Sequence, residues 1–399
     1  MTQKFLPYGR HAIDEDDILA VSEALRGDFL TTGPRVEEFE TGFAAATGTR
    51  HAVACNSGTA ALHLAVLALG IAPDEAAIVP SLTFLATANV ARMAGADVVF
   101  ADVDPDTGLM TAQTFAEALE RAKSAGLTVK TALPVHLNGQ VCDMADIAAA
   151  ADKHGIALIE DACHALGAAD IGATPYSRIA CFSTHPVKAI ATGEGGVATT
   201  ADDELARRMR LLRNHGMTRE AGVFVHKGMA FDGDVANPWY YEMQEIGWNY
   251  RLPDVLCALG ISQLKKLDRF YRRRVEIAAL YDSLLAPLAP LIRPVSHGNR
   301  PHGWHLYPVL IDFDRLGKSR AETMRQLRDQ GIGTQVHYIP VHRQPYYQKL
   351  YGELSLPGAD SYYARCLSLP FYPALADTDL TRVADALAAL ISASGKVSV

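Results

Sequence analysis

The feature that most constrains the fold of this chain is the alternation of short apolar segments with helix-like segments between residues 50 and 200. The strand candidates are residues 51–55, 76–79, 97–101, 131–135, 156–159, 179–182 and 196–199. Helical patterns lie at residues 59–69, 84–94, 111–122, 144–154 and, after the last strand, 203–213. Short apolar strands that alternate with helices are typical of a mostly parallel sheet with helices on both faces. We therefore expect an α/β fold whose ligands bind at the carboxyl ends of the strands.

The rest of the chain predicts a second, smaller α/β unit. A long helix is expected from Pro253, which suits a first helical turn, past Leu284. Four prolines then mark a connection, and they are followed by a strand at 306–313, a helix at 319–330, a strand at 333–339 and a last helix at 379–391. The preceding segment, residues 222–243, is expected to be irregular. We predict a large domain at residues 1–262 and a small C-terminal domain at residues 263–399.

Composition and charge are those of an ordinary globular protein. Hydrophobic residues make up 49% and charged residues 21% of the 399 positions. The net charge of −8 argues against a nucleic-acid partner. The densest basic run, Arg272-Arg273-Arg274, is most simply explained as a solvated helix face.

The cysteines and apolar segments predict a cytoplasmic location. The six cysteines are scattered without CxxC spacing, which favours reduced thiols over a disulfide framework or a zinc site. The longest apolar stretch, residues 60–72, is too short to span a bilayer. The acidic residues near the N-terminus do not fit a signal peptide. We expect no membrane association.

A lysine stands directly after one of the apolar strand candidates. Residues 181–196 read CFSTHPVKAIATGEGG, so that Lys188 precedes a glycine-rich turn and another strand. An amine at this position is partly desolvated, which lowers its pKa and favours imine chemistry with a carbonyl. The turn is not a Walker A loop, because no Gly-Lys-Ser/Thr follows. Taken alone, a surface lysine in a loop is the simpler interpretation.

Two other strand ends carry polar residues that suit pyridoxal 5′-phosphate (PLP). Asp161 follows the strand at 156–159 and could keep the pyridine nitrogen of PLP protonated, with His164 beside the ring. The turn at residues 55–59, CNSGT, opens a helix whose free N–H groups and dipole would bind a phosphate. Each feature taken alone is also explained by ordinary helix capping. Phosphate site, acid and lysine in this order are together hard to explain otherwise.

Several motifs spread over nearly the whole chain strengthen this interpretation. They are GDFLTTGPRVEEF at 27–39, NSGTAAL at 56–62, PSLTFLATAN at 80–89, EDACHA at 160–165, the segment around Lys188, GWNYR at 247–251 and GTQVHY at 333–338. Together they resemble the DegT/DnrJ/EryC1/StrS sugar aminotransferases, a family of fold-type I PLP enzymes. The resemblance implies PLP as cofactor, with L-glutamate and a nucleotide-linked keto sugar as substrates.

The resemblance also implies roles for individual residues. Lys188 resembles the lysine that holds PLP as a Schiff base and moves protons in both half-reactions, and Asp161 resembles the partner of the pyridine nitrogen. The expected cofactor-binding residues are Ser57, Gly58, Thr59, Phe84, Asp161, His164, Ser183, Lys188 and Asn249. The expected substrate-binding residues are Tyr8, Gly27, Asp28, Phe29, Leu30, Gln335, Val336, His337 and Tyr338. Asn249 would reach the phosphate from a neighbouring subunit, which implies a homodimer with shared sites.

Longer stretches resemble one subgroup of the family. STHPVKAI at 183–190, PWYYEMQ at 238–244 and QVHYIPVHRQP at 335–345 resemble the C4 aminotransferases of pseudaminic acid biosynthesis, which aminate UDP-4-keto-6-deoxy-N-acetyl-L-altrosamine. A more polar residue is expected where Ala191 stands, and this leaves the finer substrate choice open. The alternatives are another UDP- or dTDP-linked keto sugar, aminated at C3 or C4, and a PLP-binding regulator without turnover. No metal is expected, because His337 and His342 have no carboxylate at ligand spacing.

Overall fold

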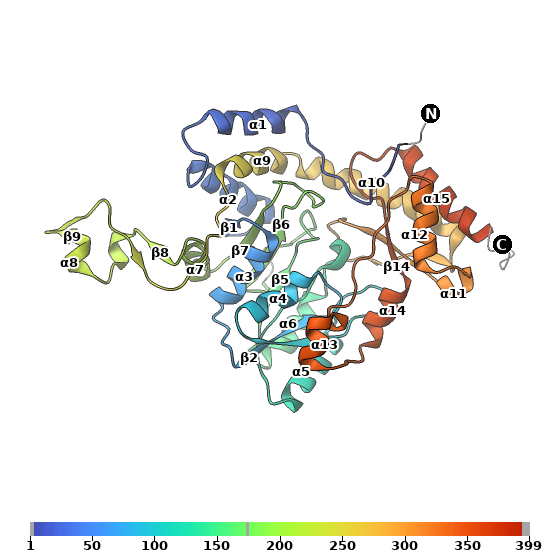
Figure 1. Ribbon diagram of the computed structural model, residues 1–399, viewed down its shortest axis with the longest axis horizontal. Helices are drawn as coiled ribbons and strands as arrows, with labels where there is room; N and C mark the ends of the chain where they lie inside the picture. The colour runs from blue at the N-terminus through green and yellow to red at the C-terminus, as the bar shows by residue number, and fades with distance from the viewer. Residues whose placement is uncertain (1–3, 173–174, 393–399) are drawn as a thin grey trace.

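A seven-stranded sheet forms the centre of the molecule, in a computed structural model that describes residues 4–172 and 175–392 (Figure 1). Its strands lie in the order β1-β7-β6-β5-β4-β2-β3. They are β1 (His51–Cys55), β2 (Glu75–Pro80), β3 (Asp97–Ala101), β4 (Thr128–Ala132), β5 (Ala157–Asp161), β6 (Ile179–Ser183) and β7 (Gly196–Thr200). Among these strands β7 alone runs opposite to the others: its pairings with β1 and β6 are antiparallel, and the remaining pairings are parallel. The expected α/β fold with a mostly parallel sheet is confirmed.

The strands are apolar on both sides because helices cover both faces of the sheet. In β1, Val53 and Cys55 belong to one apolar cluster, whereas Ala52 and Ala54 belong to another, as the two-residue period of a strand requires. Helices α3 (Gly58–Ala68), α4 (Leu85–Met93), α5 (Ala112–Ser124), α6 (Met144–Asp152) and α7 (Asp203–Arg213) contribute to the first cluster, and α2 (Pro34–Thr47) and α9 (Asp254–Leu264) to the second. Helix α1 (Glu15–Arg26) packs on α9.

The C-terminal part of the chain builds a second sheet with its own apolar cluster. The sheet is antiparallel and consists of β12 (Ile292–Pro294), β13 (Tyr307–Ile311) and β14 (Cys366–Leu369). Its helices are α10 (Leu267–Leu285), α11 (Phe313–Leu316), α12 (Arg320–Asp329), α13 (Pro345–Tyr351), α14 (Pro357–Arg365) and α15 (Asp377–Ser392). Leu6, near the other end of the chain, is buried in the same cluster. The domain boundary after residue 262 stays a prediction.

Two expected elements are wrong in detail. The single long helix is two helices, since α9 ends at Leu264 and α10 begins at Leu267. The turn between them places the amine of Lys266 against Asp14 and Asp17 of the α1 region. Residues 333–339 do not form a strand: Gln335 makes one bridge to Ser368 of β14, and the chain then runs into Pro340, which cannot donate to a ladder.

The basic run at 272–274 is not uniformly solvated. Arg272 is exposed, but Arg274 is only 3% exposed. In α10 the buried side chains of Phe270, Arg274, Ile277 and Tyr281 recur with the period of a helix, so that they share its inner face. The interpretation as a solvated helix face is therefore wrong for Arg274.

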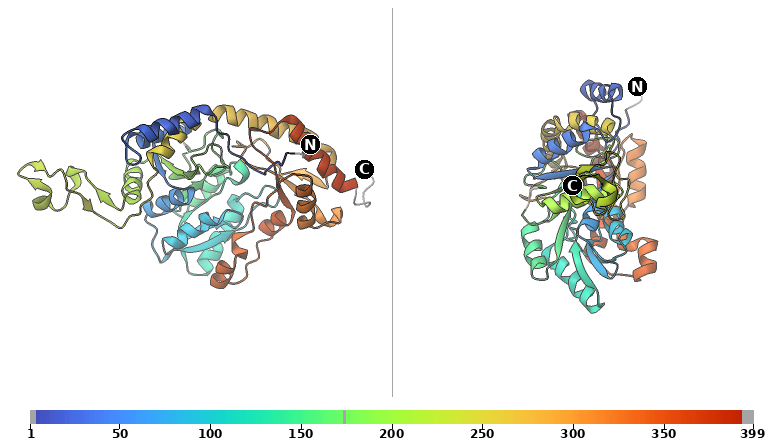
Figure 2. Two further views of the ribbon diagram at one scale, coloured as in Figure 1. Left: turned by 45° about the horizontal axis from the view of Figure 1, so that its top comes forward. Right: turned by 90° about the vertical axis from the view of Figure 1, so that its left-hand side faces the viewer.

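An arm formed by residues 217–245 projects from the body of the molecule (Figures 1 and 2). It contains β8 (Met217–Thr218), α8 (Lys227–Ala230), β9 (Phe231–Asp232), β10 (Val235–Ala236), β11 (Glu242–Met243) and the short turn η2 (Ala221–Val223). The carboxylate of Glu242 accepts hydrogen bonds from the backbone of Val225 and His226 and from the Tyr240 hydroxyl, which fixes the shape of the arm. Within the described residues, no helix has the length and apolar character needed to cross a membrane.

Candidate active site

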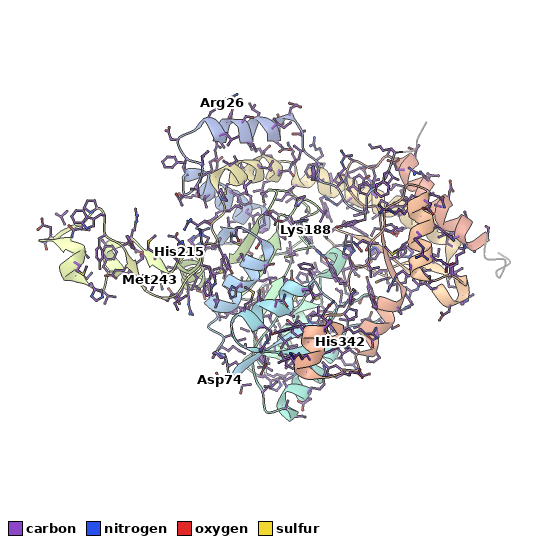
Figure 3. The ribbon with its side chains drawn as sticks, viewed as in Figure 1. Arg26, Asp74, Lys188, His215, Met243 and His342 are labelled. Atoms are coloured by element: carbon purple, nitrogen blue, oxygen red, sulfur yellow. The ribbon has the colours of Figure 1, made fainter. Side chains whose placement is uncertain are left out.

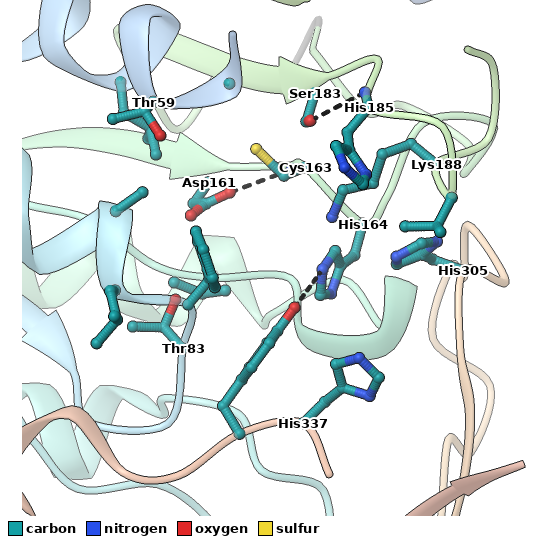
Figure 4. Close-up of a pocket in the computed structure, with 18 of the residues that line it drawn as sticks. Thr59, Thr83, Asp161, Cys163, His164, Ser183, His185, Lys188, His305 and His337 are labelled. Carbon is teal, nitrogen blue, oxygen red and sulfur yellow. Dashed lines mark hydrogen bonds between the residues drawn. The ribbon is translucent and has the colours of Figure 1, made fainter. Parts of the chain in front are cut away.

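A pocket of about 680 Å³ opens at the carboxyl ends of β5 and β6, beside the first turn of α3 (Figure 4). Figure 3 places Lys188 within the body of the molecule and Met243 on the arm. Thirteen of the residues expected at the site lie in different parts of the sequence but line this one pocket. They are Tyr8, Ser57, Gly58, Thr59, Phe84, Asp161, His164, Ser183, Lys188, Gln335, Val336, His337 and Tyr338.

Lys188 lies in the loop between β6 and β7, and its side chain enters the pocket (Figure 4). The backbone N–H of Lys188 donates to the carbonyl of His185 at 2.8 Å, which closes a turn just after β6. Burial lowers the pKa of the amine below its usual value, although the nearby Cys163 and Asp161 oppose this shift. The amine is thus more easily neutral than that of an exposed lysine, as a nucleophile or a proton acceptor requires.

Asp161 is the last residue of β5, and its side chain is only 5% exposed. One carboxylate oxygen accepts a hydrogen bond of 2.6 Å from the hydroxyl of Thr87, and the other accepts from the backbone N–H of Cys163 at 3.2 Å. The Thr87 hydroxyl in turn lies 2.8 Å from that of Thr83. Because Thr87 donates to Asp161, the proton between the two threonines must come from Thr83. This chain of hydrogen bonds orients the carboxylate toward the pocket.

The first turn of α3 forms an anion cradle at the pocket wall. The Ser57 hydroxyl oxygen caps the helix by accepting from the N–H of Ala60 at 3.0 Å, which leaves the N–H groups of Gly58 and Thr59 for a ligand. A Cβ at Gly58 would lie 2.8 Å from the Cβ of Ser183, and one at Gly196 would lie 2.2 Å from the carbonyl oxygen of Ser57. Both glycines are therefore required for α3, β6 and β7 to approach so closely.

His164 is buried beside Tyr338, and its protonation state follows from its partners. The backbone N–H of Asn138 donates to Nδ1 of His164 at 3.2 Å, and burial lowers the pKa of the imidazole well below its usual value. The neutral ring must then carry its proton on Nε2, which lies 3.2 Å from the hydroxyl oxygen of Tyr338. Since Tyr338 accepts that hydrogen bond, its own proton is available to a ligand in the pocket.

Part of the pocket lining is aromatic. Phe84 is 55% exposed, and its ring centroid lies 5.9 Å from that of Tyr338. Tyr8 contacts His337 with a centroid distance of 5.4 Å, and Nδ1 of His337 is 2.8 Å from the hydroxyl of Ser368. Burial lowers the pKa of His337 to about 3, so this imidazole is also neutral.

The remaining expected residues do not line the pocket of their own chain. Asn249 lies beside the end of β1, where its carbonyl accepts from the Asn56 side chain at 3.4 Å. Gly27, Asp28, Phe29 and Leu30 form an exposed turn between α1 and α2. Ala191 is buried outside the pocket, and its N–H donates to the side chain of Gln263 at 3.2 Å.

Several residues that line the pocket or hold its lining residues in place were not assigned a role from the sequence. Thr87 lies within a quoted motif, but its bond to Asp161 joins residues 74 positions apart. His305 is buried against His164, with ring centroids 4.4 Å apart, and its Nδ1 has no hydrogen-bond partner in the described part of the chain. His185 and Glu194 flank Lys188 in the lining. The only signal in the sequence that could have pointed to His305 is its position just before strand β13.

Comparison with known proteins agrees with this geometry. The sequence model described as the DegT/DnrJ/EryC1/StrS aminotransferase family matches residues 11–388. The spore coat polysaccharide biosynthesis protein SpsC of Bacillus subtilis (strain 168) is 41% identical over 402 residues, which cover 97% of this chain and 98% of SpsC.

Solved structures are similar over almost the full length. Helicobacter pylori PseC, an aminotransferase involved in pseudaminic acid biosynthesis, is 29% identical with a TM-score of 0.87, covering 98% of this chain and 100% of PseC. The putative sugar aminotransferase Spr1654 from Streptococcus pneumoniae, in its PMP form, is 25% identical with a TM-score of 0.86, covering 98% and 100%. A PLP form of Spr1654 also matches, with a TM-score of 0.86, covering 98% and 99%.

The residues of the pocket fit PLP. The α3 cradle, where a Cβ at Gly58 would clash with Ser183, offers backbone donors for a phosphate. Asp161 offers a buried carboxylate for a protonated pyridine nitrogen, and Lys188 offers an amine of lowered pKa for the aldehyde carbon. Phe84 presents an exposed ring in the lining, suited to stacking on an aromatic cofactor.

Replacing Lys188 by alanine should remove both covalent cofactor binding and turnover. Borohydride should attach PLP permanently to the wild-type chain but not to Lys188→Ala, and turnover should fall by at least about a thousandfold. Peptide mapping by mass spectrometry and single-turnover absorbance measure the two effects. Lys153→Ala, at an exposed lysine, is the control. Borohydride labelling that persists in Lys188→Ala would contradict the assignment.

Removing the hydroxyl of Thr87 should weaken PLP binding through Asp161. Hydrogen bonds to charged groups contribute about 1.5–3 kcal/mol, so Thr87→Val should raise the Kd for PLP by about tenfold or more, and Thr87→Ser should restore it. Titration of the apoenzyme with PLP measures this. Thr131→Val, which removes another buried hydroxyl bound to the carbonyl of Ala157, should leave the Kd unchanged. Equal affinity in the wild type and Thr87→Val would show that the hydrogen bond from Thr87 to Asp161 does not support cofactor binding.

Proposed function

The chain belongs to the DegT/DnrJ/EryC1/StrS aminotransferase family, and from this premise we propose that it transfers the amino group of L-glutamate to C4 of UDP-4-keto-6-deoxy-N-acetyl-L-altrosamine, a step of pseudaminic acid biosynthesis. It is a PLP-dependent sugar aminotransferase. The observation that carries the assignment of roles is the convergence of Lys188, Asp161 and the α3 cradle on one pocket. The roles of all site residues below are part of the proposal.

Bound PLP supplies an electron-withdrawing ring that stabilises negative charge at the carbon from which a proton is removed. Asp161 pairs with the protonated pyridine nitrogen, and its two hydrogen bonds, from Thr87 and Cys163, hold the carboxylate in position for this contact. Gly58, Thr59 and Ser183 bind the phosphate, and Phe84 covers the ring. These residues fix the orientation of the reacting atoms rather than take part in bond breaking.

Lys188 moves the protons. Its amine takes the proton from Cα of the amino donor and later delivers a proton to C4 of the sugar. Burial lowers the pKa of the amine, so a larger fraction is neutral and able to accept a proton near pH 7. Tyr338, whose proton is available to a ligand, is suited to donate a hydrogen bond to the keto oxygen of the sugar.

The similarity to PseC supports the pseudaminic acid substrate, and the extended segment at 335–338 that lines the pocket carries part of the sequence resemblance to that subgroup. A second candidate is another nucleotide-linked keto sugar. It is favoured by SpsC, because the identity to SpsC, 41%, exceeds the 29% to PseC. A regulator without turnover is disfavoured, because Lys188 and Asp161 are both present and lie in one pocket.

We also propose a homodimer with two shared sites. The described lining of the pocket contains no arginine, although the sugar nucleotide carries a diphosphate and L-glutamate two carboxylates. The arm exposes apolar side chains that a second subunit could cover: Val225, Met229, Val235, Trp239, Tyr241 and Met243. The exposed turn at 27–30 and Asn249 then contribute to the pocket of the partner. The six unpaired cysteines support a location in the reducing cytoplasm.

A substrate panel separates the candidate reactions. Purified holoenzyme should convert L-glutamate and UDP-4-keto-6-deoxy-N-acetyl-L-altrosamine to 2-oxoglutarate and a 4-amino sugar, with kcat/KM at least about tenfold above that for dTDP-linked or 3-keto sugars. NMR of the product identifies the aminated carbon and its stereochemistry. The reverse preference would replace the pseudaminic assignment by the second candidate.

Mixed dimers test the shared sites. Lys188→Ala and Asn249→Asp should each be inactive, the latter because its carboxylate repels the phosphate. Coexpressed with different tags, their heterodimers should contain one intact site of two, so a statistical mixture should regain about a quarter of wild-type activity. Coexpression of two differently tagged chains that both carry Lys188→Ala is the control. If Asn249 served its own chain, each site of the heterodimer would carry one defect, and no activity would return.

A further inference from the structure

Arg274 carries a buried positive charge that no acid balances. Its neighbours on α10 are paired, Arg272 with Asp268 and Arg273 with Glu276 and Asp377. Within the described residues Arg274 forms no ion pair, its Nε has no hydrogen-bond partner, and one terminal nitrogen donates a long bond of 3.4 Å to the carbonyl of Lys188. An ionised group in such surroundings is costly unless an opposite charge accompanies it.

A small cavity lies against Arg274 and against the loop that carries Lys188. Its volume is about 10 Å³, the room needed for one water-sized particle. The residues that line it include Arg274, Gln263 and Ala191, together with Arg10 and His11, which are both exposed. None of the described lining residues is an aspartate or a glutamate.

The nearest acids on the α1 side are already matched. Asp14 and Asp17 both bind the amine of Lys266, and Asp17 also accepts from the side chain of Gln263 at 2.8 Å. The amide oxygen of Gln263 is occupied by the N–H of Ala191. The basic residues Arg10, His11, Lys188 and Arg274 therefore line this cavity, whereas Asp14, Asp17 and the Gln263 amide oxygen are engaged elsewhere.

We propose that this cavity is a binding site for a single halide ion, chloride in the cell, held by Arg274 from below and attracted by Arg10 at the mouth. A monatomic anion fits the volume and supplies the missing negative charge. Lys188 lines both this cavity and the pocket that holds PLP, but the site does not depend on the identity of the sugar. By neutralising Arg274, the ion keeps its guanidinium against the carbonyl of Lys188 and so steadies the loop that carries this lysine.

Bromide locates the site in the unaltered protein. Crystals of the PLP holoenzyme grown in sodium bromide, with data collected at the bromine absorption edge, should show an anomalous peak within about 3.5 Å of the Arg274 guanidinium. Absence of that peak, with a water molecule in the cavity instead, would overturn the proposal.

Thermal unfolding tests the linkage in solution. At constant ionic strength, replacing sodium gluconate by sodium bromide should raise the Tm of the holoenzyme by about 2 °C for each tenfold increase above half-saturation. Arg274→Met should abolish this dependence, and Arg272→Met, at an exposed arginine, should retain it. A bromide dependence that survives in Arg274→Met would contradict the site.

A milder variant covers the case in which Arg274→Met does not fold. Arg10 is exposed, so Arg10→Gln should leave the fold unchanged but raise the half-saturating bromide concentration by about threefold, because one cation at the mouth is lost. An unchanged bromide dependence in Arg10→Gln, together with the absence of the anomalous peak, would rule the halide site out.

Discussion

The close approach of three backbone segments at Gly58 and Gly196 is the constraint on which the site depends. Gly196 opens β7 and is paired both with Cys55 of β1 and with Ser183 of β6. The antiparallel β7 therefore lies between β1 and β6 and pairs with both. Because Gly196 has no side chain, the Ser57 carbonyl can lie against it. Only with this spacing does the first turn of α3 point its N–H groups at the loop that carries Lys188. The one antiparallel strand thus determines where an anion can bind in an otherwise parallel sheet.

The charges around Lys188 follow from burial and from the direction of hydrogen bonds. His164, His305 and His337 are all held neutral, in each case chiefly by desolvation. A neutral wall leaves the Asp161 carboxylate as the main charge near the lysine amine, and this charge opposes, without outweighing, the lowering of the amine's pKa by burial. Behind the same loop, the buried charge of Arg274 is the opposite case, a cation without an acid. The loop therefore lies between a neutral, ligand-binding side and a positively charged, internal side.

Much of the fold and the centre of the site could be predicted because they depend on local patterns. Asp161 and Lys188 follow apolar runs, and the carboxyl ends of such strands meet at one edge of a sheet. Thr87 and His305 act through partners distant in sequence, which no local pattern contains. Arg274 was in reach, since Phe270, Arg274, Ile277 and Tyr281 are spaced as one helix face. Three adjacent arginines suggested a solvated surface, but the helical period decides which of them is buried.

The segment that carries Asn249 connects the cradle to the arm. The N–H of Asn56, at the end of β1, donates to the carbonyl of Tyr250 at 2.9 Å, and the hydroxyl of Tyr250 lies 3.2 Å from His63 on α3. Trp248 packs edge to face on the same histidine. The helix whose first turn forms the anion cradle is therefore packed against the segment that leads out of the arm. A second subunit that covers the apolar side chains of the arm would also stabilise this segment and, through its contacts with His63, helix α3. Assembly and cofactor binding would then stabilise each other.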